Sequence, residues 1–453
     1  MIEEKNTELE FHFGKFGALI PLASMLFGIM ALVLLGFTAA KTFWAAGLLA
    51  LTLAFLLAKD KSKFSDSVIK GLSNNIMAVM VIAFYLAGIT AQLLKDGGLV
   101  QGLLWLTSQI NMGPEFVPLI SFLICVLIST CTGTTGGTVS AVTPIMLPLG
   151  VSLGCDPALL MGAILSGSFF GDNLAPVSDT TIASAYTQEV DVPAVVRSRL
   201  KYSIIAGIGA AILYVIFGFR TASAVAATTA IDSSAAISLV LLLSPAVLVF
   251  AMIRGMSLVP ALVLCNLVTI AINLVFGLTT FEQLVGPGGI IISGIEGMVF
   301  LTVFCVFIFA LIQMLTDSGV FDWLIEKLTA NVKTPRQAEF VAAGLDVVVT
   351  LMTAAATASI AMVGPVMRKI FKKYKIERAR GANILDGIAC GVGGLCFWNL
   401  SPMSAWSLAL NTGAVSEDFS IISAMPYSFH CMLLVVVYFV AILTGWGRKF
   451  EDQ

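Results

Sequence analysis

Residues 157–190 read PALLMGAILSGSFFGDNLAPVSDTTIASAYTQEV, an apolar stretch that is interrupted in its middle by polar residues and a proline. A helix needs about 20 mostly apolar residues to span a bilayer, and this stretch is long enough. Proline removes a backbone hydrogen bond inside a helix and frees carbonyl groups. The sequence therefore predicts a membrane helix that is broken near Pro176. A second stretch, 382–413, has the same character and predicts a second broken helix.

The composition of the whole chain is that of a membrane protein. Of its 453 residues, 58% are hydrophobic and 11% charged, whereas a soluble domain carries about 25% charged residues. This excludes a water-soluble enzyme and a disordered chain, and a net charge of −2 gives no basic surface for nucleic acid. Further apolar runs predict spanning helices at 16–37, 42–58, 75–94, 202–219, 237–253, 257–277, 299–316 and 428–446.

The basic residues predict how the chain is threaded through the membrane. Lys and Arg accumulate in cytoplasmic loops, and the richest loop is 368–380, RKIFKKYKIERAR. Placing this loop inside puts both termini inside, including a polar tail at 1–14. All but three of the 25 basic residues, namely Lys41, Lys95 and Arg220, then lie on that face. We therefore expect a multi-pass protein of the inner (plasma) membrane with no basic side chain near the bilayer centre.

This threading requires two segments that enter and leave on one face. Residues 116–150 have no basic residue on either flank, so they would form a re-entrant hairpin from outside, and 339–365 would form one from inside. Small polar residues near the middle of each segment mark the predicted tips, where hydroxyls and amides could face a ligand or simply close a turn. The tip residues are Thr132, Gly133, Thr134, Thr135, Gly136 and Gly137 in the first hairpin, and Thr353 and Thr357 in the second.

The two halves of the chain repeat each other. VTPIM at 142–146 matches VGPVM at 363–367, and NLAPVS at 173–178 matches NLSPMS at 399–404. The predicted topology places the two copies, 15–220 and 221–453, in opposite orientations. Paired broken helices in inverted repeats are typical of secondary transporters and indicate the binding site. The alternative is a pair of ordinary proline kinks in a helical bundle.

Two carboxylates without a predicted partner indicate the chemistry. Asp172 lies about 22 Å along the helix from Pro157, near the middle of the bilayer, and Asp179 follows the break. A carboxylate there costs about 2.5–3.5 kcal/mol. With no basic side chain expected nearby, a proton or a metal cation must offset that cost, and H⁺ and Na⁺ would compete for the site. Further oxygen ligands could come from Asn173, Ser178, Thr180 and Thr181.

The stretch GDNLAPVSDTTIASA at 171–185 resembles the signature of the NhaC family of Na⁺/H⁺ antiporters. That family belongs to a superfamily with paired re-entrant hairpins. The resemblance implies Na⁺ as the coupling ion, no organic cofactor, and an elevator-like motion against a scaffold, 16–58 and 237–277, that could form a homodimer. It also implies that the ion and proton site consists of Asp172, Asn173, Ser178, Asp179 and Thr180, with Na⁺ held by Asp172, Asn173 and Asp179. Some family members resemble exchangers of organic acids or carriers of amino acids.

The second repeat differs in a way that keeps an organic substrate open. Its motif, FWNLSPMSAWS at 397–407, lacks the acid and contains two tryptophans, which suit an organic molecule but also serve as packing or interface residues. The substrate site predicted there consists of Trp398, Asn399, Ser401, Ser404 and Trp406. Two further acids, Asp346 and Asp386, could line the inner part of an ion path or be satisfied by neighbouring hydroxyls.

The leading hypothesis is thus a secondary transporter that exchanges Na⁺ for H⁺ by alternating access. The alternative is a carrier or exchanger of a small carboxylate or amino acid, coupled to Na⁺ or H⁺. An intramembrane aspartyl protease is disfavoured, because Phe169 stands where the first glycine of its Gly-x-Gly-Asp signature is needed.

Overall fold

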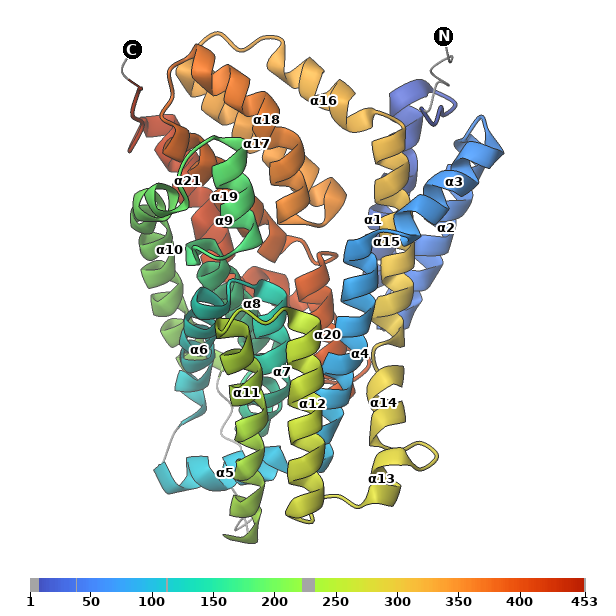
Figure 1. The fold of residues 1–453 in the computed structure, drawn as a ribbon, viewed down its shortest axis with the longest axis vertical. Coiled ribbons are helices and arrows are strands. Elements are labelled where there is room, and N and C mark those ends of the chain that lie inside the picture. The colour runs from blue at the N-terminus through green and yellow to red at the C-terminus, as the bar shows by residue number, and fades with distance from the viewer. Residues whose placement is uncertain (1–7, 38, 111–112, 222–232, 452–453) are drawn as a thin grey trace.

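The structure, a computed structural model, describes residues 8–37, 39–110, 113–221 and 233–451 (Figure 1). Within these ranges the chain folds into α-helices and short 3-10 helices, and its two isolated bridges form no strand. Eight helices, or up to ten if each of two bent helix pairs is one span, are long and apolar enough to cross a membrane. The predicted all-α polytopic fold is therefore confirmed. Residues 1–7 of the predicted tail, and 222–232 at the predicted start of the second repeat, lie outside the described residues.

The helices follow the predicted order in both halves. Those of the first half are α1 (Gly14–Leu34), α2 (Phe43–Leu57), α3 (Lys61–Leu72), α4 (Asn75–Asp96), α5 (Leu99–Ile110), α6 (Val117–Thr132), α7 (Thr135–Ser152), α8 (Pro157–Leu174), α9 (Asp179–Thr187) and α10 (Val192–Thr221). Those of the second half are α11 (Leu243–Ile253), α12 (Leu258–Val275), α13 (Phe281–Val285), α14 (Ile290–Glu296), α15 (Val299–Asp317), α16 (Val320–Thr329), α17 (Pro335–Thr353), α18 (Ala356–Lys373), α19 (Arg378–Leu395), α20 (Leu400–Thr412) and α21 (Phe429–Thr444).

Each predicted hairpin segment is a pair of helices joined by the same kind of tight turn. The turn between α6 and α7 passes through Gly133 in the left-handed region (φ 67°), and the turn between α17 and α18 passes through Ala354 (φ 51°). In both turns the next residue, Thr134 or Ala355, is extended. Helix α6 has 16 residues and rises about 24 Å, less than a bilayer core of about 30 Å.

Each long polar-interrupted stretch is likewise two helices with a non-helical break. Helices α8 and α9 meet at a bend of 41° with residues 175–178 between them, and residues 396–399 separate α19 from α20. The prolines of the matching motifs play different parts, contrary to the expectation that both break a helix. Pro176 lies in the first break, but Pro402 lies in the first turn of α20, where a missing N–H costs little.

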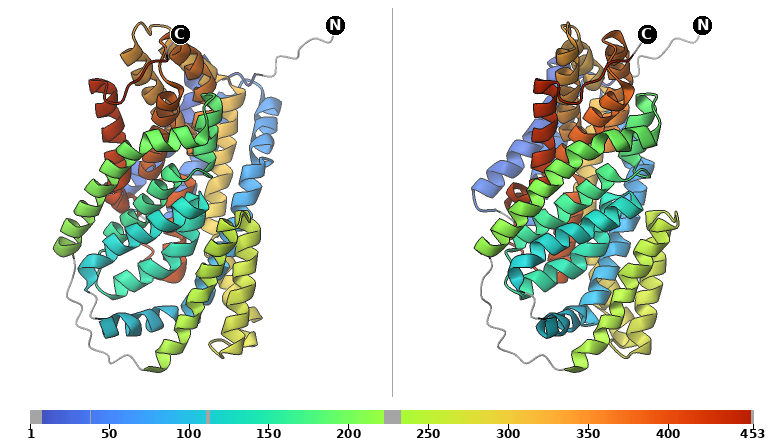
Figure 2. Two further views of the ribbon diagram at one scale, coloured as in Figure 1. Left: turned by 60° about the vertical axis from the view of Figure 1, so that its left-hand side comes forward. Right: turned by 90° about the vertical axis from the view of Figure 1, so that its left-hand side faces the viewer.

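Equivalent elements of the two halves make equivalent contacts. Helix α7 of the first hairpin packs against α20 of the second broken helix, and α18 of the second hairpin packs against α9 of the first. Helices α10 and α21, which end the two halves, pack against each other. Figure 2 shows α6, α7 and α8 side by side, with α10 running obliquely across them. Hairpins, broken helices, α10 and α21 therefore form one bundle with contributions from both halves.

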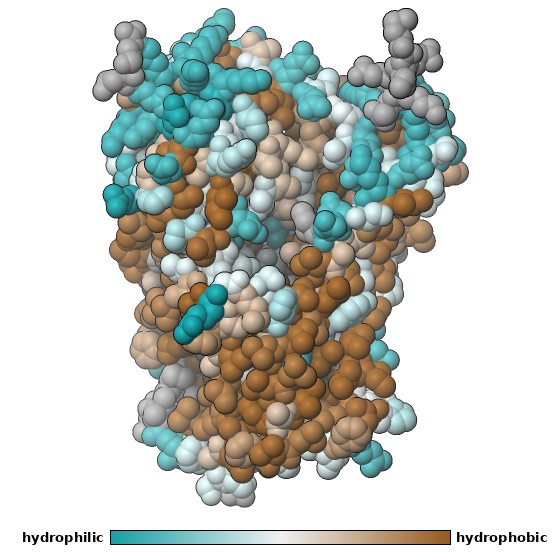
Figure 3. Space-filling view, in the orientation of Figure 1, coloured by the Kyte–Doolittle hydropathy of each residue, from teal (hydrophilic) through white to brown (hydrophobic). Residues whose placement is uncertain are grey.

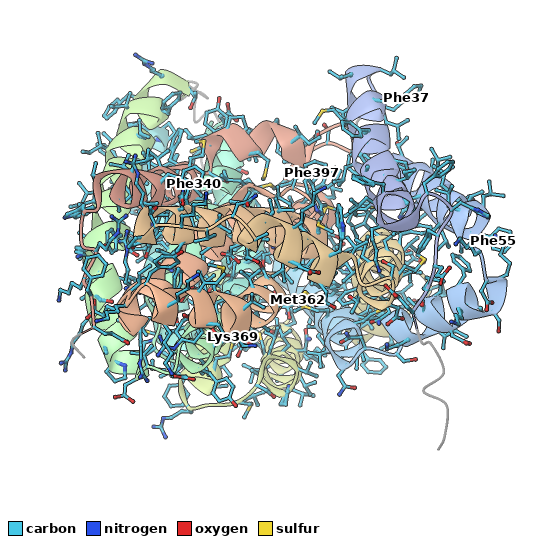
Figure 4. The ribbon with its side chains drawn as sticks, turned by 90° about the horizontal axis from the view of Figure 1, so that it is seen from above. Phe37, Phe55, Phe340, Met362, Lys369 and Phe397 are labelled. Atoms are coloured by element: carbon cyan, nitrogen blue, oxygen red, sulfur yellow. The ribbon has the colours of Figure 1, made fainter. Side chains whose placement is uncertain are left out.

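The remaining long helices form a second group beside this bundle. Helix α15 packs against α2 and α3, and α4 packs against α12 and α14. From above, Phe340, Met362 and Lys369 mark hairpin helices α17 and α18, whereas Phe37 and Phe55 mark the opposite edge of the molecule (Figure 4). This second group contains α1, α2 and α12, which the sequence predicted as part of a scaffold.

The two ends of the molecule differ in polarity. Both described ends of the chain lie at the end of the molecule that is uppermost in Figure 1, and the surface there is largely hydrophilic, while the lower part is largely hydrophobic (Figure 3). The amphipathic helices that precede the hairpins lie at opposite ends, α16 at the upper and α5 at the lower end. The inversion of the two repeats remains a prediction.

The turn of the first hairpin yields a stability prediction. In Gly133→Ala the new methyl group would lie 2.7 Å from the Val177 side chain and 3.0 Å from the Ser178 nitrogen, at a φ that costs a non-glycine residue roughly 1–2 kcal/mol. We expect a lower unfolding temperature in detergent. The matched control, Ala354→Gly, relieves the same backbone strain in the second hairpin and should unfold no earlier than the wild type. Equal unfolding temperatures for Gly133→Ala and the wild type would show that the turn tolerates a side chain.

Candidate functional site

The tip of the first hairpin lies against the first helix break. Gly133 approaches Val177 and Ser178 so closely that no side chain fits between them. One residue into α7, the Thr135 hydroxyl donates a hydrogen bond of 2.7 Å to Oδ2 of Asp172, in the last turn of α8. The tip and the break, which the sequence treated as separate motifs, therefore meet at one carboxylate.

Asp172 is buried and only half satisfied. Its side chain is 9% exposed, and its second oxygen, Oδ1, has no hydrogen-bond partner. The hydroxyl oxygen of Thr132, at the end of α6, is also buried without a partner, and the Ser178 hydroxyl lies near the carboxylate. No basic side chain of the described residues pairs with Asp172. A buried carboxylate in this position can bind a proton or a small cation.

The start of α9 is built from the polar residues that the sequence singled out. Ser178 is the N-cap residue, because its hydroxyl accepts a bond from the Thr180 nitrogen at 3.3 Å. The same hydroxyl lies 2.9 Å from that of Thr180, which in turn lies 3.6 Å from the Cys390 sulfur of α19. The positive end of the α9 dipole therefore points toward the break, where it favours negative charge.

Asp179 does not join Asp172 in the interior. It is the first residue of α9, directly after the N-cap, and its side chain is exposed. The expectation that two unpaired acids share one buried site thus holds for Asp172 alone. The helical geometry explains the difference, since successive residues of a helix point in different directions and Thr180, its neighbour, takes the inward position.

Asn173 is buried, but each of its polar groups already has a partner. Its side-chain oxygen accepts a bond of 2.6 Å from Ser203, and its side-chain nitrogen donates to Asp386 at 3.3 Å. Its backbone carbonyl, one of those freed by the break, accepts a bond from Arg199. In this arrangement Asn173 joins α8, α10 and α19, and its part in a Na⁺ site remains a prediction.

Arg199 corrects the expectation that no basic side chain reaches the interior. The sequence placed it in a cytoplasmic loop, but α10 begins at Val192, so Arg199 lies two turns inside a helix. Its guanidinium is fully buried, pairs with Asp386 at 2.5 Å and donates to the Thr181 hydroxyl at 2.8 Å. Asp386 is therefore neutralised by Arg199. It also accepts bonds from Thr181, Ser184 and Cys390.

A sequence signal for Arg199 did exist. Arg199, Ser203, Ala206 and Ala210 recur at helical spacing, and all four are buried. A stripe of small residues marks the face of a helix that packs closely, so an arginine on that stripe points inward. The distribution of Lys and Arg between the two faces does not reveal that Arg199 is buried, because the topology rule takes every basic residue near a helix end to be solvated.

The predicted residues of the second repeat have mainly structural contacts. Asn399 caps α20, the indole N–H of half-buried Trp398 donates to the Leu351 carbonyl at 2.9 Å, and Ser404 is buried while Ser401 is partly exposed. Trp406 is fully buried between the rings of Phe43 and Phe300. At the second tip, the Thr353 hydroxyl donates to the Val349 carbonyl at 2.8 Å, and Thr357 is exposed. These residues do not gather around Asp172.

The similarity of this chain to known protein families and proteins bears on this geometry. A model of the "Na⁺/H⁺ antiporter family" matches residues 11–219 and 221–446, almost the whole chain. The chain belongs to the Na⁺/H⁺ antiporter family. The Na⁺/H⁺ antiporter NhaC of Alkalihalophilus pseudofirmus is 24% identical over 403 residues, which cover 84% of each chain. The membership agrees with the resemblance that the signature at 171–185 indicated, and identifies the chain as a multi-pass transporter.

Two other relatives carry names that include organic substrates. The malate-2H⁺/Na⁺-lactate antiporter of Bacillus subtilis is 32% identical over 171 residues, which cover 38% of this chain and 36% of that protein. The arginine/ornithine antiporter ArcD of Halobacterium salinarum is 24% identical over 479 residues, which cover 99% of this chain and 96% of that protein. Proteins similar to this chain thus include some named for inorganic and some named for organic substrates.

The buried ion pair yields a prediction for a double-mutant cycle. Removing one partner of a buried pair leaves an uncompensated charge and typically costs about 3–5 kcal/mol. We expect Asp386→Asn and Arg199→Gln each to lower the free energy of unfolding by an amount of this order, measured by denaturant unfolding in detergent. The double variant should lose less than the sum of the two. Additive losses would mean that the two side chains do not interact energetically.

Proposed function

We propose that this transporter exchanges Na⁺ for H⁺ and that both ions compete for Asp172. The observation that carries the proposal is the buried Asp172 carboxylate, which has one free oxygen at the meeting point of a hairpin tip and a helix break. Membership of the antiporter family supports it. The chain acts as a carrier and not as an enzyme, because the chemistry of the site consists of binding and release.

The competition follows from the electrostatics of burial. Burying a carboxylate away from water costs free energy unless a positive charge accompanies it. Asp172 has no basic side chain as a partner among the described residues. Either H⁺ on one of its oxygens or Na⁺ beside them removes that cost, but one cation excludes the other. Thr132, Thr135 and Ser178 supply hydroxyl oxygens around Na⁺, a hard cation that favours oxygen ligands.

Alternating access would follow from the division of the molecule into two groups of helices. The bundle that carries the hairpins and breaks moves, in this proposal, against the group that contains α1, α2 and α12. An elevator of this kind would carry Asp172 from one face of the inner membrane to the other. The end with both termini and the basic loop 368–380 is placed in the cytoplasm, and the α1–α2 side is the candidate surface for a homodimer.

A second candidate is an exchanger of a small carboxylate or amino acid coupled to the same cations. The likeness to the arginine/ornithine antiporter, which extends over 99% of this chain, favours it. The buried packing of Trp406 makes it a poor wall for such a substrate, so half-buried Trp398 at the second break is the better candidate. Thermal stabilisation by a panel of organic acids and amino acids would separate the two functions.

The proposal predicts different effects for two neighbouring acids. In proteoliposomes with an imposed pH gradient, Asp172→Asn should abolish the dissipation of the gradient that Na⁺ causes in the wild type, because the amide binds neither cation as the carboxylate does. The matched control is Asp179→Asn, which alters an exposed acid seven residues away and should retain most of the activity. If Asp179→Asn is inactive and Asp172→Asn is active, the site is assigned to the wrong carboxylate.

A further inference from the structure

The second hairpin contains a buried acid that the proposed Asp172 site does not use. Asp346 lies in the middle of α17, and its side chain is 0% exposed. Glu339, two turns earlier on the same helix, is equally buried but pairs with Arg380 at 3.0 Å and Arg448 at 2.6 Å. Asp346 pairs with no basic side chain of the described residues. Of these two buried acids on one helix, Glu339 therefore has basic partners and Asp346 has none.

Among the described residues, the side chain that hydrogen-bonds to the Asp346 carboxyl group is Ser359, across the hairpin on α18. The Ser359 hydroxyl lies 2.5 Å from Oδ1 of Asp346 and 3.2 Å from the backbone carbonyl oxygen of the same residue. A hydroxyl has one hydrogen, so if Asp346 is ionised the two acceptors compete for it. The contact at 3.2 Å is then the weak arm of a shared hydrogen bond or no hydrogen bond at all.

A proton on Asp346 resolves this conflict. The carboxyl O–H then donates from Oδ1 to the Ser359 oxygen, and the Ser359 hydrogen is free to donate to the Asp346 carbonyl. The remaining oxygen, Oδ2, is buried without a hydrogen-bond partner, as is the hydroxyl of Thr350 one turn away on α17. An unpartnered oxygen is far less costly on a neutral acid than on an anion. The contacts therefore fit the protonated form.

The charged surroundings point the same way. On α19, Asp386 already pairs with the buried arginine near it, Arg199, so that arginine is not available to offset an anion at Asp346. No other charged or titratable group on the elements packed against α17 pairs with Asp346. Those groups are Asp322, Glu326 and Lys327 on α16, Arg368, Lys369, Lys372 and Lys373 on α18, Arg378, Arg380 and Cys390 on α19, and His430, Cys431 and Tyr438 on α21.

We propose that Asp346 is a second proton-carrying site, separate from Asp172, at which the carboxyl hydrogen bridges the two helices of the second hairpin through Ser359. The inference rests on the proposed exchange of Na⁺ for H⁺. An O–H bond forms at Oδ1 with a proton taken from water on one side of the membrane and breaks with its return to water on the other. Each transport cycle then moves one proton more than the Asp172 site alone carries.

The bridge also couples proton binding to the hairpin. Loss of the proton removes one of the two hydrogen bonds between Asp346 and Ser359 and leaves a buried anion that favours hydration. In this proposal α17 and α18 then separate locally and admit water to the site. Protonation on the other face restores the closed pair, so the hairpin is closed when it is loaded.

Infrared difference spectroscopy tests the protonation state directly in the full-length protein. We expect the wild type in vesicles to show the C=O bands of two protonated carboxyl groups, Asp172 and Asp346, that are lost reversibly when the pH is raised. The Asp346 band should be absent in Asp346→Asn, shifted in Ser359→Ala, and still present in Asp172→Asn, which removes only the Asp172 band. This last variant separates the two proposals, because it removes exchange at Asp172 without touching the second hairpin.

Flux measurements complete the test. In proteoliposomes, Asp346→Asn should move one proton fewer for each Na⁺ than the wild type, or lose exchange altogether while still binding Na⁺. Three results would each overturn the assignment of Asp346. They are an Asp346 band that is unchanged across the pH range of transport, no band that Asp346→Asn removes, and loss of the Asp346 band in Asp172→Asn when Na⁺ is added at constant pH, which would make Asp346 a Na⁺ ligand.

Discussion

The cost of burying charge controls the centre of this transporter. Burying a carboxylate away from water costs several kcal/mol unless a cation accompanies it, and the bundle buries both Asp172 and Asp386. A fixed cation, Arg199, pairs with Asp386. Because the guanidinium also donates to the Asn173 carbonyl, it joins the end of α8 to α10 and α19. The arrangement of the break depends on this pair, whereas Asp172 has no basic partner among the described residues and is the carboxylate that we propose for exchange.

The two halves have similar backbone geometry but carry different polar side chains. Both hairpins turn through one left-handed residue, and both broken helices pack against a hairpin helix of the other half. The first half has an acid at its break and threonines at its hairpin tip. In the second half the tip is Ala354–Ala355, and the unpaired acid, Asp346, lies within the hairpin. Similar frames thus present different side chains, so that a cation site and a proton site can coexist.

Much of this architecture could be predicted from the sequence. Apolar runs of the right length have few alternatives to membrane helices, and the matching motifs at 173–178 and 399–404 indicated two related halves with breaks. Asp172 and Thr135 were both predicted as candidate site residues. Polar side chains inside an apolar membrane segment cost free energy, so they stand out in the sequence. Asp179 was misplaced and Arg199 missed, since each depends on the direction in which one side chain points, and hydropathy does not report direction.

The sequence by itself determined that the chain lies in a membrane, that its fold is all-helical, and where the two breaks occur. These features follow from local apolarity and from residues that disfavour a continuous helix. Only the tertiary structure decided which buried charges are paired. Arg199 and Asp386 are 187 positions apart along the chain, and Asp346 meets Ser359 only after the hairpin closes. Coulomb energy depends on separation in space and on the exclusion of water, and neither quantity exists until the helices pack.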